Sequence, residues 1–329
     1  MIGRRALLCA LALPLLLASS RTFGQQHRVW RVGFLALPKR PEPIESSRFG
    51  AFALGMRELG YVEGENLQIE WRFAEGDVGR LAELAAELVR LKVDIIVAGS
   101  TPAIRAAQKA TVAIPIVMAT NNDPVGSGFV ESLRRPGGNI TGLSNLSTDL
   151  SPKIVELLRS LAPKVTHVAV LSNPSNLSNA AVLKNLQAPM QTAGLRILPV
   201  DATTPAEISK GFAAMREQGA DAVIVAPDSM FVEQRALIAD LALANRMPSV
   251  FSFREHVEAG GLISYGDHLA DSYHRAAVYV DRIFKGAKPA DLPVEQSARL
   301  ELFIHRGTAK MLGLVIPADV IALANEVIE

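Results

Sequence analysis

The sequence has a single cysteine, Cys9, among its 329 residues. Cys9 lies inside an apolar run from Ala6 to Ala18, which follows Arg4 and Arg5 and precedes the small residue Gly24. This order is typical of a secretory signal peptide, so we predict that residues 1–24 are removed on export to the periplasm. The remaining chain then has no cysteine, which excludes disulfides, a thiolate nucleophile and cysteine metal ligands.

The apolar N-terminal run is too short to remain as a membrane anchor. A buried N-terminal helix is the alternative interpretation, and the export route, general secretory or twin-arginine, stays open. Lipid attachment at Cys9 is disfavoured because Leu8 stands where a small residue is needed. No second run is long enough to cross a bilayer.

The sequence also lacks an excess of charge of either sign, with 34 Lys and Arg against 33 Asp and Glu. Loss of Arg4, Arg5 and Arg21 with the signal leaves 31 basic against 33 acidic residues, a net charge near −2. No block of like charge occurs. The sequence therefore predicts a soluble protein that does not bind nucleic acid.

Motifs for catalysis or cofactor binding are missing as well. A GxGxxG fingerprint is absent; the nearest approach, at Gly126 to Gly128, follows Pro124 and not a strand. There is no phosphate-binding GxxxxGK[ST], no GxSxG, and no metal-binding spacing among the six histidines. We therefore predict no catalytic residue, no metal and no cofactor.

What the chain does have is the stretch VDIIVAGSTPA. Ile95 to Ala98 is a short β-branched run, typical of a strand buried on both faces. Gly99 ends it, and Ser100, Thr101 and Pro102 suit the start of a helix whose free N–H groups would face a ligand. A similar strand and polar turn recur in ADAVIVAPDSM, residues 220–230.

Strands and helical patterns alternate along the rest of the chain. This order predicts an α/β fold of two Rossmann-like lobes with parallel sheets, joined by a hinge of about three crossover strands. We assign residues 28–144 and 266–289 to lobe 1, and residues 145–265 and 290–329 to lobe 2. We also expect one helix from Phe231 to Ala244 and a helical tail to Glu329.

Ligands of open α/β sheets bind at the carboxyl ends of the strands. Polar or aromatic residues at the predicted strand ends are therefore candidate ligand-binding residues: Ser100, Thr101, Pro102, Asn121, Asn122 and Asp123 in lobe 1, and Asn173, Asn176, Asp228, Ser229, Phe253 and Tyr265 in lobe 2. Alternatives stay open at several positions. Ser100 and Thr101 suit helix capping alone, Asp123 suits a plain turn before a proline, and Phe253 and Tyr265 suit a buried core.

Several segments also carry a family resemblance, namely ELGYVEGENLQIEWRFAEG, ELAAELVRLKVDIIVAGSTPA, IPIVMATNNDPVGSGFVESLRRPGGNITGLS, REHVEAGGLISYG, YVDRIFKGAKPADLPVEQ and LGLVIPADV. In these segments the chain resembles the periplasmic substrate-binding proteins of ABC importers with the type I fold, in the tryptophan/tyrosine-type branch. The resemblance implies two lobes, a small-molecule ligand in the cleft, such as an aromatic amino acid, and docking on a membrane permease driven by an ATPase.

Three function classes were weighed. A binding protein, which we expect to be a monomer, would capture its ligand by hinge closure. A transcription regulator of the same fold would need a DNA-binding helix pair where this chain has an export signal. A secreted hydrolase on the same sheets would need a nucleophile with a matched base.

Overall fold

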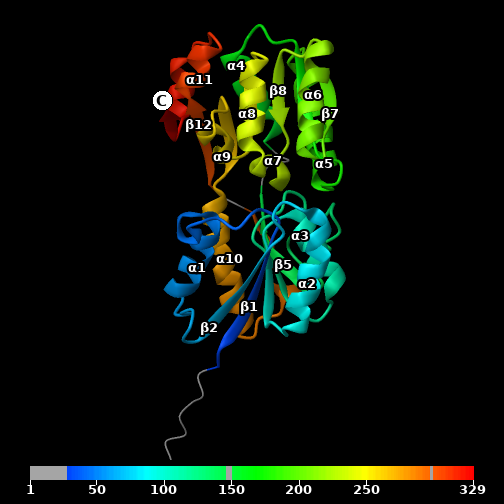
Figure 1. Cartoon of the computed structure of the whole chain (residues 1–329), viewed down its shortest axis with the longest axis vertical. Helices are drawn as coiled ribbons and strands as arrows, with labels where there is room; N and C mark the ends of the chain where they lie inside the picture. The colour runs from blue at the N-terminus through cyan, green and yellow to red at the C-terminus, as the bar shows by residue number, and fades with distance from the viewer. Residues whose placement is uncertain (1–27, 146–149, 297–298) are drawn as a thin grey trace, which may run out of the picture.

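The computed structural model describes residues 28–145, 150–296 and 299–329. The predicted signal peptide, residues 1–24, lies outside these ranges. The described chain forms two α/β lobes stacked along the long axis of the molecule (Figure 1). Each lobe is built on its own sheet, which confirms the predicted fold class.

Lobe 1 has a six-stranded sheet in the order β11-β5-β4-β3-β1-β2, with every pairing parallel. Its strands are β1 (Trp30–Ala36), β2 (Leu67–Phe73), β3 (Ile95–Ala98), β4 (Ile116–Met118), β5 (Ile140–Ser144) and β11 (Glu295–Gln296). Its helices are α1 (Arg48–Glu58), α2 (Leu81–Arg90), α3 (Thr101–Ala110) and α10 (Leu269–Phe284), with short 3₁₀ turns η1 (Ile44–Ser46), η2 (Val78–Arg80) and η3 (Pro289–Asp291).

Lobe 2 has a seven-stranded sheet in the order β13-β12-β10-β9-β8-β6-β7, parallel except between β10 and β12. Its strands are β6 (His167–Ser172), β7 (Arg196–Asp201), β8 (Ala222–Val225), β9 (Ser249–Phe251), β10 (Ile263–Asp267), β12 (Leu300–His305) and β13 (Glu326–Ile328). Its helices are α4 (Ser151–Leu161), α5 (Ser178–Thr192), α6 (Pro205–Glu217), α7 (Ser229–Glu233), α8 (Arg235–Ala244), α9 (Arg254–Glu258), α11 (Arg306–Met311) and α12 (Ala318–Leu323).

Both sheets are covered on two faces at their centres, which explains the unbroken apolar runs of β3 and β8. All four residues of β3 and of β8 are buried, as expected for strands between two helical layers. In lobe 1, α1 and α10 pack side by side over one face, where Phe34, Phe49 and Tyr273 lie in ring contact. The central strands of both sheets end at the boundary between the lobes.

The chain passes between the sheets three times, after β5, after β10 and after β11. This agrees with the predicted hinge of about three crossovers. The predicted boundary at residue 290 differs from the sheet membership, because β11 pairs with β5 in lobe 1. Glu295 is held there by an ion pair with Arg275 of α10 at 3.1 Å. Likewise β10 stays in the lobe 2 sheet to Asp267, past the predicted boundary at 266.

Two further sequence expectations were wrong in detail. The single helix predicted from Phe231 to Ala244 is two helices, α7 and α8, divided at Gln234. The tail is not helical to its end, because β13 pairs in parallel with β12. No helix among the described ranges is both long and apolar enough to cross a membrane.

Candidate ligand-binding cleft

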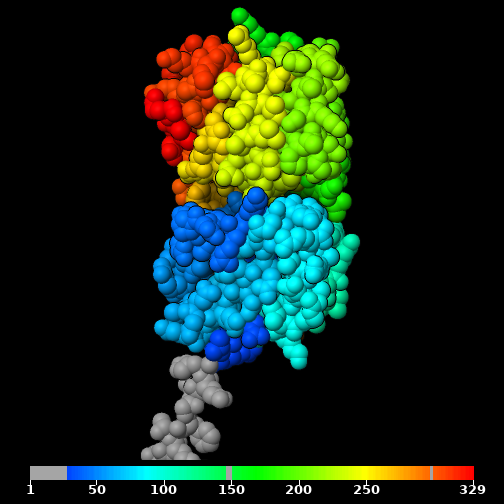
Figure 2. Space-filling view, viewed as in Figure 1, coloured from blue at the N-terminus to red at the C-terminus, as the bar shows by residue number. Residues whose placement is uncertain are grey.

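The carboxyl ends of the central strands of the two lobes face each other across a narrow cleft. Figure 2 shows the two lobes in close contact along this boundary. The cleft is lined by residues that follow β3, β4, β5, β8 and β9, together with one at the start of the β6–α5 segment: Gly99, Ser100, Thr101, Thr120, Asn121, Asn122, Asn145, Asn176, Pro227, Asp228, Ser229 and Phe253.

On the lobe 1 side, Thr101 is the centre of a hydroxyl and amide network. Its Oγ1 accepts a hydrogen bond from Asn121 Nδ2 at 2.9 Å and lies 3.3 Å from Ser178 Oγ of lobe 2. Ser100 caps α3, since its Oγ accepts from the amide of Ala103 at 3.4 Å. The N-terminus of this ten-residue helix therefore points into the cleft, where its dipole favours an anionic group.

A second lobe 1 group is formed by the amides of Asn122 and Asn145. Asn145 Nδ2 donates to Asn122 Oδ1 at 2.9 Å, and Thr120 Oγ1 donates to Asn145 Oδ1. Asn122 Nδ2 in turn donates across the cleft to the carbonyl of Pro227 at 3.2 Å. The lobe 1 wall is thus polar and uncharged.

On the lobe 2 side, the carboxylate of Asp228 is the central group. It accepts from Asn173 Nδ2 at 3.2 Å and from Asn176 Nδ2 at 2.8 Å. It also caps the short helix α7 through the amide of Met230 at 2.8 Å. Asn179 supports the same turn by donating to the Pro227 carbonyl at 3.1 Å.

Asp228 is only 5 % exposed, and its partners are neutral donors. Burial raises the pKa of this carboxyl group above its ordinary value, while the hydrogen bonds from Asn176 and Asn173 oppose the rise. Within the described ranges, no Lys, Arg or His forms an ion pair with it. A buried carboxylate without a cation is costly unless a ligand brings the positive charge.

The cleft is nearly closed in this structure. Its volume is about 30 Å³, room for about one or two water molecules. A ligand of amino-acid size needs several times this volume, so its binding requires the lobes to part or the lining side chains to move.

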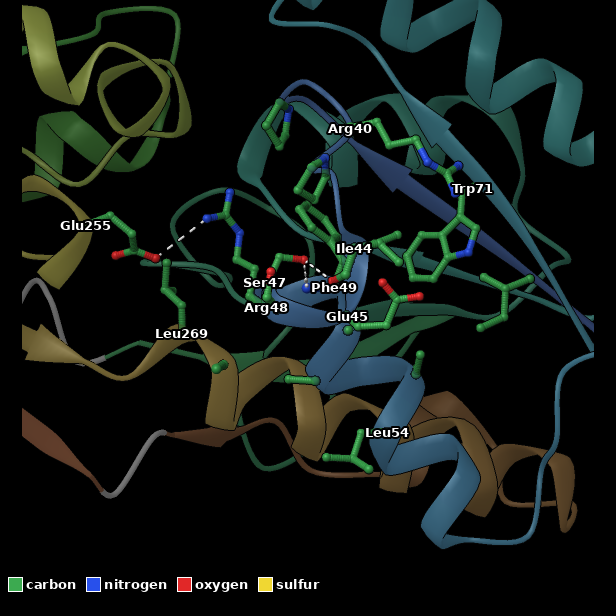
Figure 3. Close-up of a pocket in the computed structure, with 18 of the residues that line it drawn as sticks. Arg40, Ile44, Glu45, Ser47, Arg48, Phe49, Leu54, Trp71, Glu255 and Leu269 are labelled. Atoms are coloured by element: carbon green, nitrogen blue, oxygen red, sulfur yellow. Dashed lines mark hydrogen bonds and ion pairs between the residues drawn. The ribbon is translucent and has the colours of Figure 1, made fainter. Parts of the chain in front are cut away.

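A larger groove of about 980 Å³ lies beside the cleft, between α1 in lobe 1 and α9 in lobe 2 (Figure 3). Val232 and Leu269 line this groove, and they pack in one apolar cluster with Phe253, which lines the cleft. This cluster lies between the polar cleft and the groove. Phe253 of this cluster lines the same cleft as Asp228.

The structure brings together most of the residues predicted from the sequence. Eight of the predicted positions line the cleft, namely Ser100, Thr101, Asn121, Asn122, Asn176, Asp228, Ser229 and Phe253. Asn173 lies behind them and holds Asp228.

Three predicted residues lie elsewhere. Pro102 lies within the first turn of α3 and is not among the lining residues. Asp123 closes the following turn, where its Oδ1 accepts from the amide of Gly126 at 2.7 Å. Tyr265 lies on the same face of β10 as Ile263, and this face packs on the lobe 2 core. The turn alternative describes the place of Asp123, and the core alternative describes that of Tyr265.

Sequence reasoning missed Gly99, Thr120, Asn145 and Pro227 as lining residues. Asn145 directly follows β5, so the same rule of strand ends would have found it. Pro227 contributes its carbonyl, which no side-chain pattern reveals. Within the described residues, no group of three or more His, Cys, Asp or Glu side chains could hold a metal ion.

Known proteins resemble the chain over most of its length. The tyrosine-binding protein of Clostridioides difficile strain R20291 is 28 % identical over 284 residues, which are 86 % of this chain and 81 % of the relative. A solved ABC domain from Streptococcus pneumoniae in complex with L-Trp is 28 % identical, with a TM-score of 0.85, over 91 % of this chain and 100 % of the neighbour.

A second solved neighbour is a substrate-binding protein with adhesive properties from Clostridium difficile in its ligand-free, open form. It is 26 % identical, with a TM-score of 0.66, over 91 % of this chain and 99 % of the neighbour. At nearly equal identity, the present structure is therefore more similar in shape to the L-Trp complex than to the open form.

The sequence profile of ABC transporter substrate-binding proteins matches residues 45–328, which covers both lobes and the hinge. The match agrees with the two-lobed fold and with the polar cleft at the strand ends. The chain belongs to the family of ABC transporter substrate-binding proteins.

Proposed function

We propose that this protein is the periplasmic solute-binding component of an ABC importer and that it captures an aromatic amino acid in the cleft between its lobes. Hinge closure would trap the ligand, and a membrane permease driven by an ATPase would receive it. Family membership supports the transport role, and the signal-like N-terminal sequence supports the location. In this role the protein is a monomer and performs no catalysis.

Asp228 carries the proposal about the ligand. A buried carboxylate at the cleft, held by four neutral donors, is complementary to an ammonium group. The N-terminus of α3, with the hydroxyls of Ser100 and Thr101, is complementary to a carboxylate. Together the two walls match the two charges of a free amino acid.

The apolar part of the ligand would lie against Phe253 and its neighbours Val232 and Leu269. An aromatic ring suits this surface because flat rings stack or pack edge to face on phenylalanine. The names of two relatives support the same class, since one is called a tyrosine-binding protein and the other was solved with L-Trp.

Isothermal titration calorimetry tests the proposal. Protein lacking residues 1–24 is unfolded in urea and refolded to remove any co-purified solute, then titrated with L-Trp, L-Tyr and L-Phe. We expect at least one of them to bind, and N-acetyl-L-tryptophan, which lacks the ammonium group, to bind about 100-fold more weakly or not at all. Equal binding of the acetylated compound, or no binding of any aromatic amino acid, would contradict the proposal.

A further inference from the structure

An ion pair outside the cleft joins a helix of lobe 1 to a helix of lobe 2. Arg48, at the start of α1 in lobe 1, lies 3.6 Å from Glu255, on α9 in lobe 2, measured between a guanidinium nitrogen and Oε1. Figure 3 shows the pair bridging the groove between the two lobes. The side chains are 16 % and 23 % exposed, so solvent screens this pair less than an ordinary surface pair.

The guanidinium of Arg48 is held in place on the lobe 1 side. Its Cζ lies 5.1 Å from the ring centroid of Phe49 and 5.8 Å from that of Tyr273. A cation packed near aromatic rings loses little further freedom when it meets a carboxylate. The pair therefore forms at a lower entropic cost than one between two free surface side chains.

Tyr273 connects Arg48 to the loop that lines the cleft. It is 2 % exposed, and its hydroxyl donates to the carbonyl of Gly99 at 3.1 Å. A side chain at position 99 would collide with this hydroxyl, which explains the glycine. The lobe 1 half of the ion pair is thus fixed to the loop that carries Ser100 and Thr101.

The bonds within the cleft behave differently from this ion pair. Thr101 with Ser178, and Asn122 with the Pro227 carbonyl, join the lobes where a ligand would enter. A ligand would compete for those groups. The Arg48–Glu255 pair lies in the groove, so it is able to persist in the closed state with or without a ligand.

We propose that Arg48 and Glu255 form a latch that stabilises the closed arrangement of the lobes, with Tyr273 positioning Arg48 relative to the Gly99–Thr101 loop. The latch adds to the affinity for ligand because it lowers the free energy of the closed form relative to the open form. Its effect on affinity rests on the proposed function, whereas its effect on the lobes themselves is measurable without any ligand.

The test is a distance measurement between spin labels on opposite sides of the cleft. Exposed Lys109 of α3 and Lys184 of α5 are replaced by cysteine in the protein lacking residues 1–24, which has no other cysteine, and pulsed electron paramagnetic resonance records the open and closed populations. We expect Glu255→Gln and Arg48→Gln each to lower the ratio of closed to open molecules about fivefold. The charge swap Arg48→Glu with Glu255→Arg should restore at least half of the loss.

Glu87→Gln is the matched control, because Glu87 and Arg72 form an ion pair of similar exposure within lobe 1. The proposal is overturned if Glu255→Gln shifts the ratio no more than Glu87→Gln does. It is also overturned if the swap restores nothing, or if the wild-type chain has no closed population in the absence of ligand. Failure of L-Trp to bind would count against the proposed ligand alone, since the label distances are recorded in its absence as well.

Discussion

The two walls of the cleft differ in charge. Lobe 1 presents hydroxyls, amides and the N-terminus of α3, whereas lobe 2 presents the buried carboxylate of Asp228. The polar groups of the lobe 1 wall form hydrogen bonds with one another and with lobe 2. Lobe 2 carries a charge that its own neutral donors stabilise only in part. Under the proposed function, lobe 2 selects for a cation and lobe 1 orients the rest of the ligand.

The largest effect is expected from a substitution that removes the charge of the lobe 2 wall. Asp228→Asn should weaken binding of L-Trp about 100-fold or more, because the ammonium group loses its only proposed counter-charge. Titration calorimetry measures the loss. Asp123→Asn is the control, since Asp123 closes a turn beside the cleft and does not line it. Equal losses in the two variants would remove the distinction between the walls.

The same variant separates binding from stability. The folded-state pKa of Asp228 lies above its ordinary value, so ionisation of this carboxyl group favours the unfolded chain. The free energy of unfolding therefore falls as the pH rises from the ordinary pKa through the folded-state pKa. Asp228→Asn removes the cost of burying the charge. We expect urea unfolding at pH 7 to give a free energy of unfolding equal to or higher than that of the wild-type chain. A clear loss of stability would show that the carboxylate serves the fold instead.

A second buried titratable group, His256, also lies in lobe 2. His256 of lobe 2 is buried against Phe251, with ring centroids 4.5 Å apart, and burial lowers its pKa to about 4. The unfolded chain therefore takes up a proton that the folded chain refuses between pH 6.5 and about 4. Stability from this residue is complete above pH 6.5 and is lost as the pH falls, by on the order of 2 kcal/mol near pH 5.

His256→Phe should flatten this acid dependence in urea unfolding curves measured between pH 7 and pH 5. His274→Phe is the control, because His274 is a partly exposed partner of Glu58 in lobe 1. If the wild-type chain and His256→Phe lose stability in parallel, another group is responsible for the acid sensitivity.

The smallest effect is expected from a substitution in the uncharged lobe 1 wall. Thr101→Val keeps the shape of the side chain but removes the oxygen that contacts Asn121 and Ser178. We expect the affinity for L-Trp to fall about five- to tenfold, the range for loss of a neutral hydrogen bond. Thr141→Val removes a buried hydroxyl that donates to the Leu292 carbonyl in the same lobe, away from the cleft. It should lower stability without changing affinity.

The sequence predicted the fold well because the central strands β3, β4 and β8 are short apolar runs rich in β-branched residues. The end of each run also marked the cleft, so Thr101, Asn122 and Asp228 could be found without a structure. The rule failed where it had to tell which face of the sheet a side chain lies on. It located Tyr265 near a strand end, but alternation along β10 turns that side chain into the core.

Short strands and contacts between distant residues leave too little local sequence pattern to be predicted. The strand β11 has two residues, and its place in lobe 1 depends on pairing with β5, about 150 positions earlier in the chain. The strand β13 likewise exists only beside β12. The interlobe contact between Arg48 and Glu255 joins residues more than 200 positions apart. Such contacts depend on how the lobes meet, which no local window of sequence contains.

The interleaving of the lobes has a consequence for biosynthesis. The helix α10 supplies Tyr273, Ala276 and Val280 to the lobe 1 core, so that core is incomplete until these late residues leave the ribosome. Lobe 1 is therefore begun first but completed only after most of lobe 2 has been made. During synthesis the apolar face of α1 that packs on α10 stays uncovered while most of lobe 2 is being made. A chain truncated before residue 269 would lack α10 and β11 of lobe 1 and β12 and β13 of lobe 2, so neither lobe would be complete.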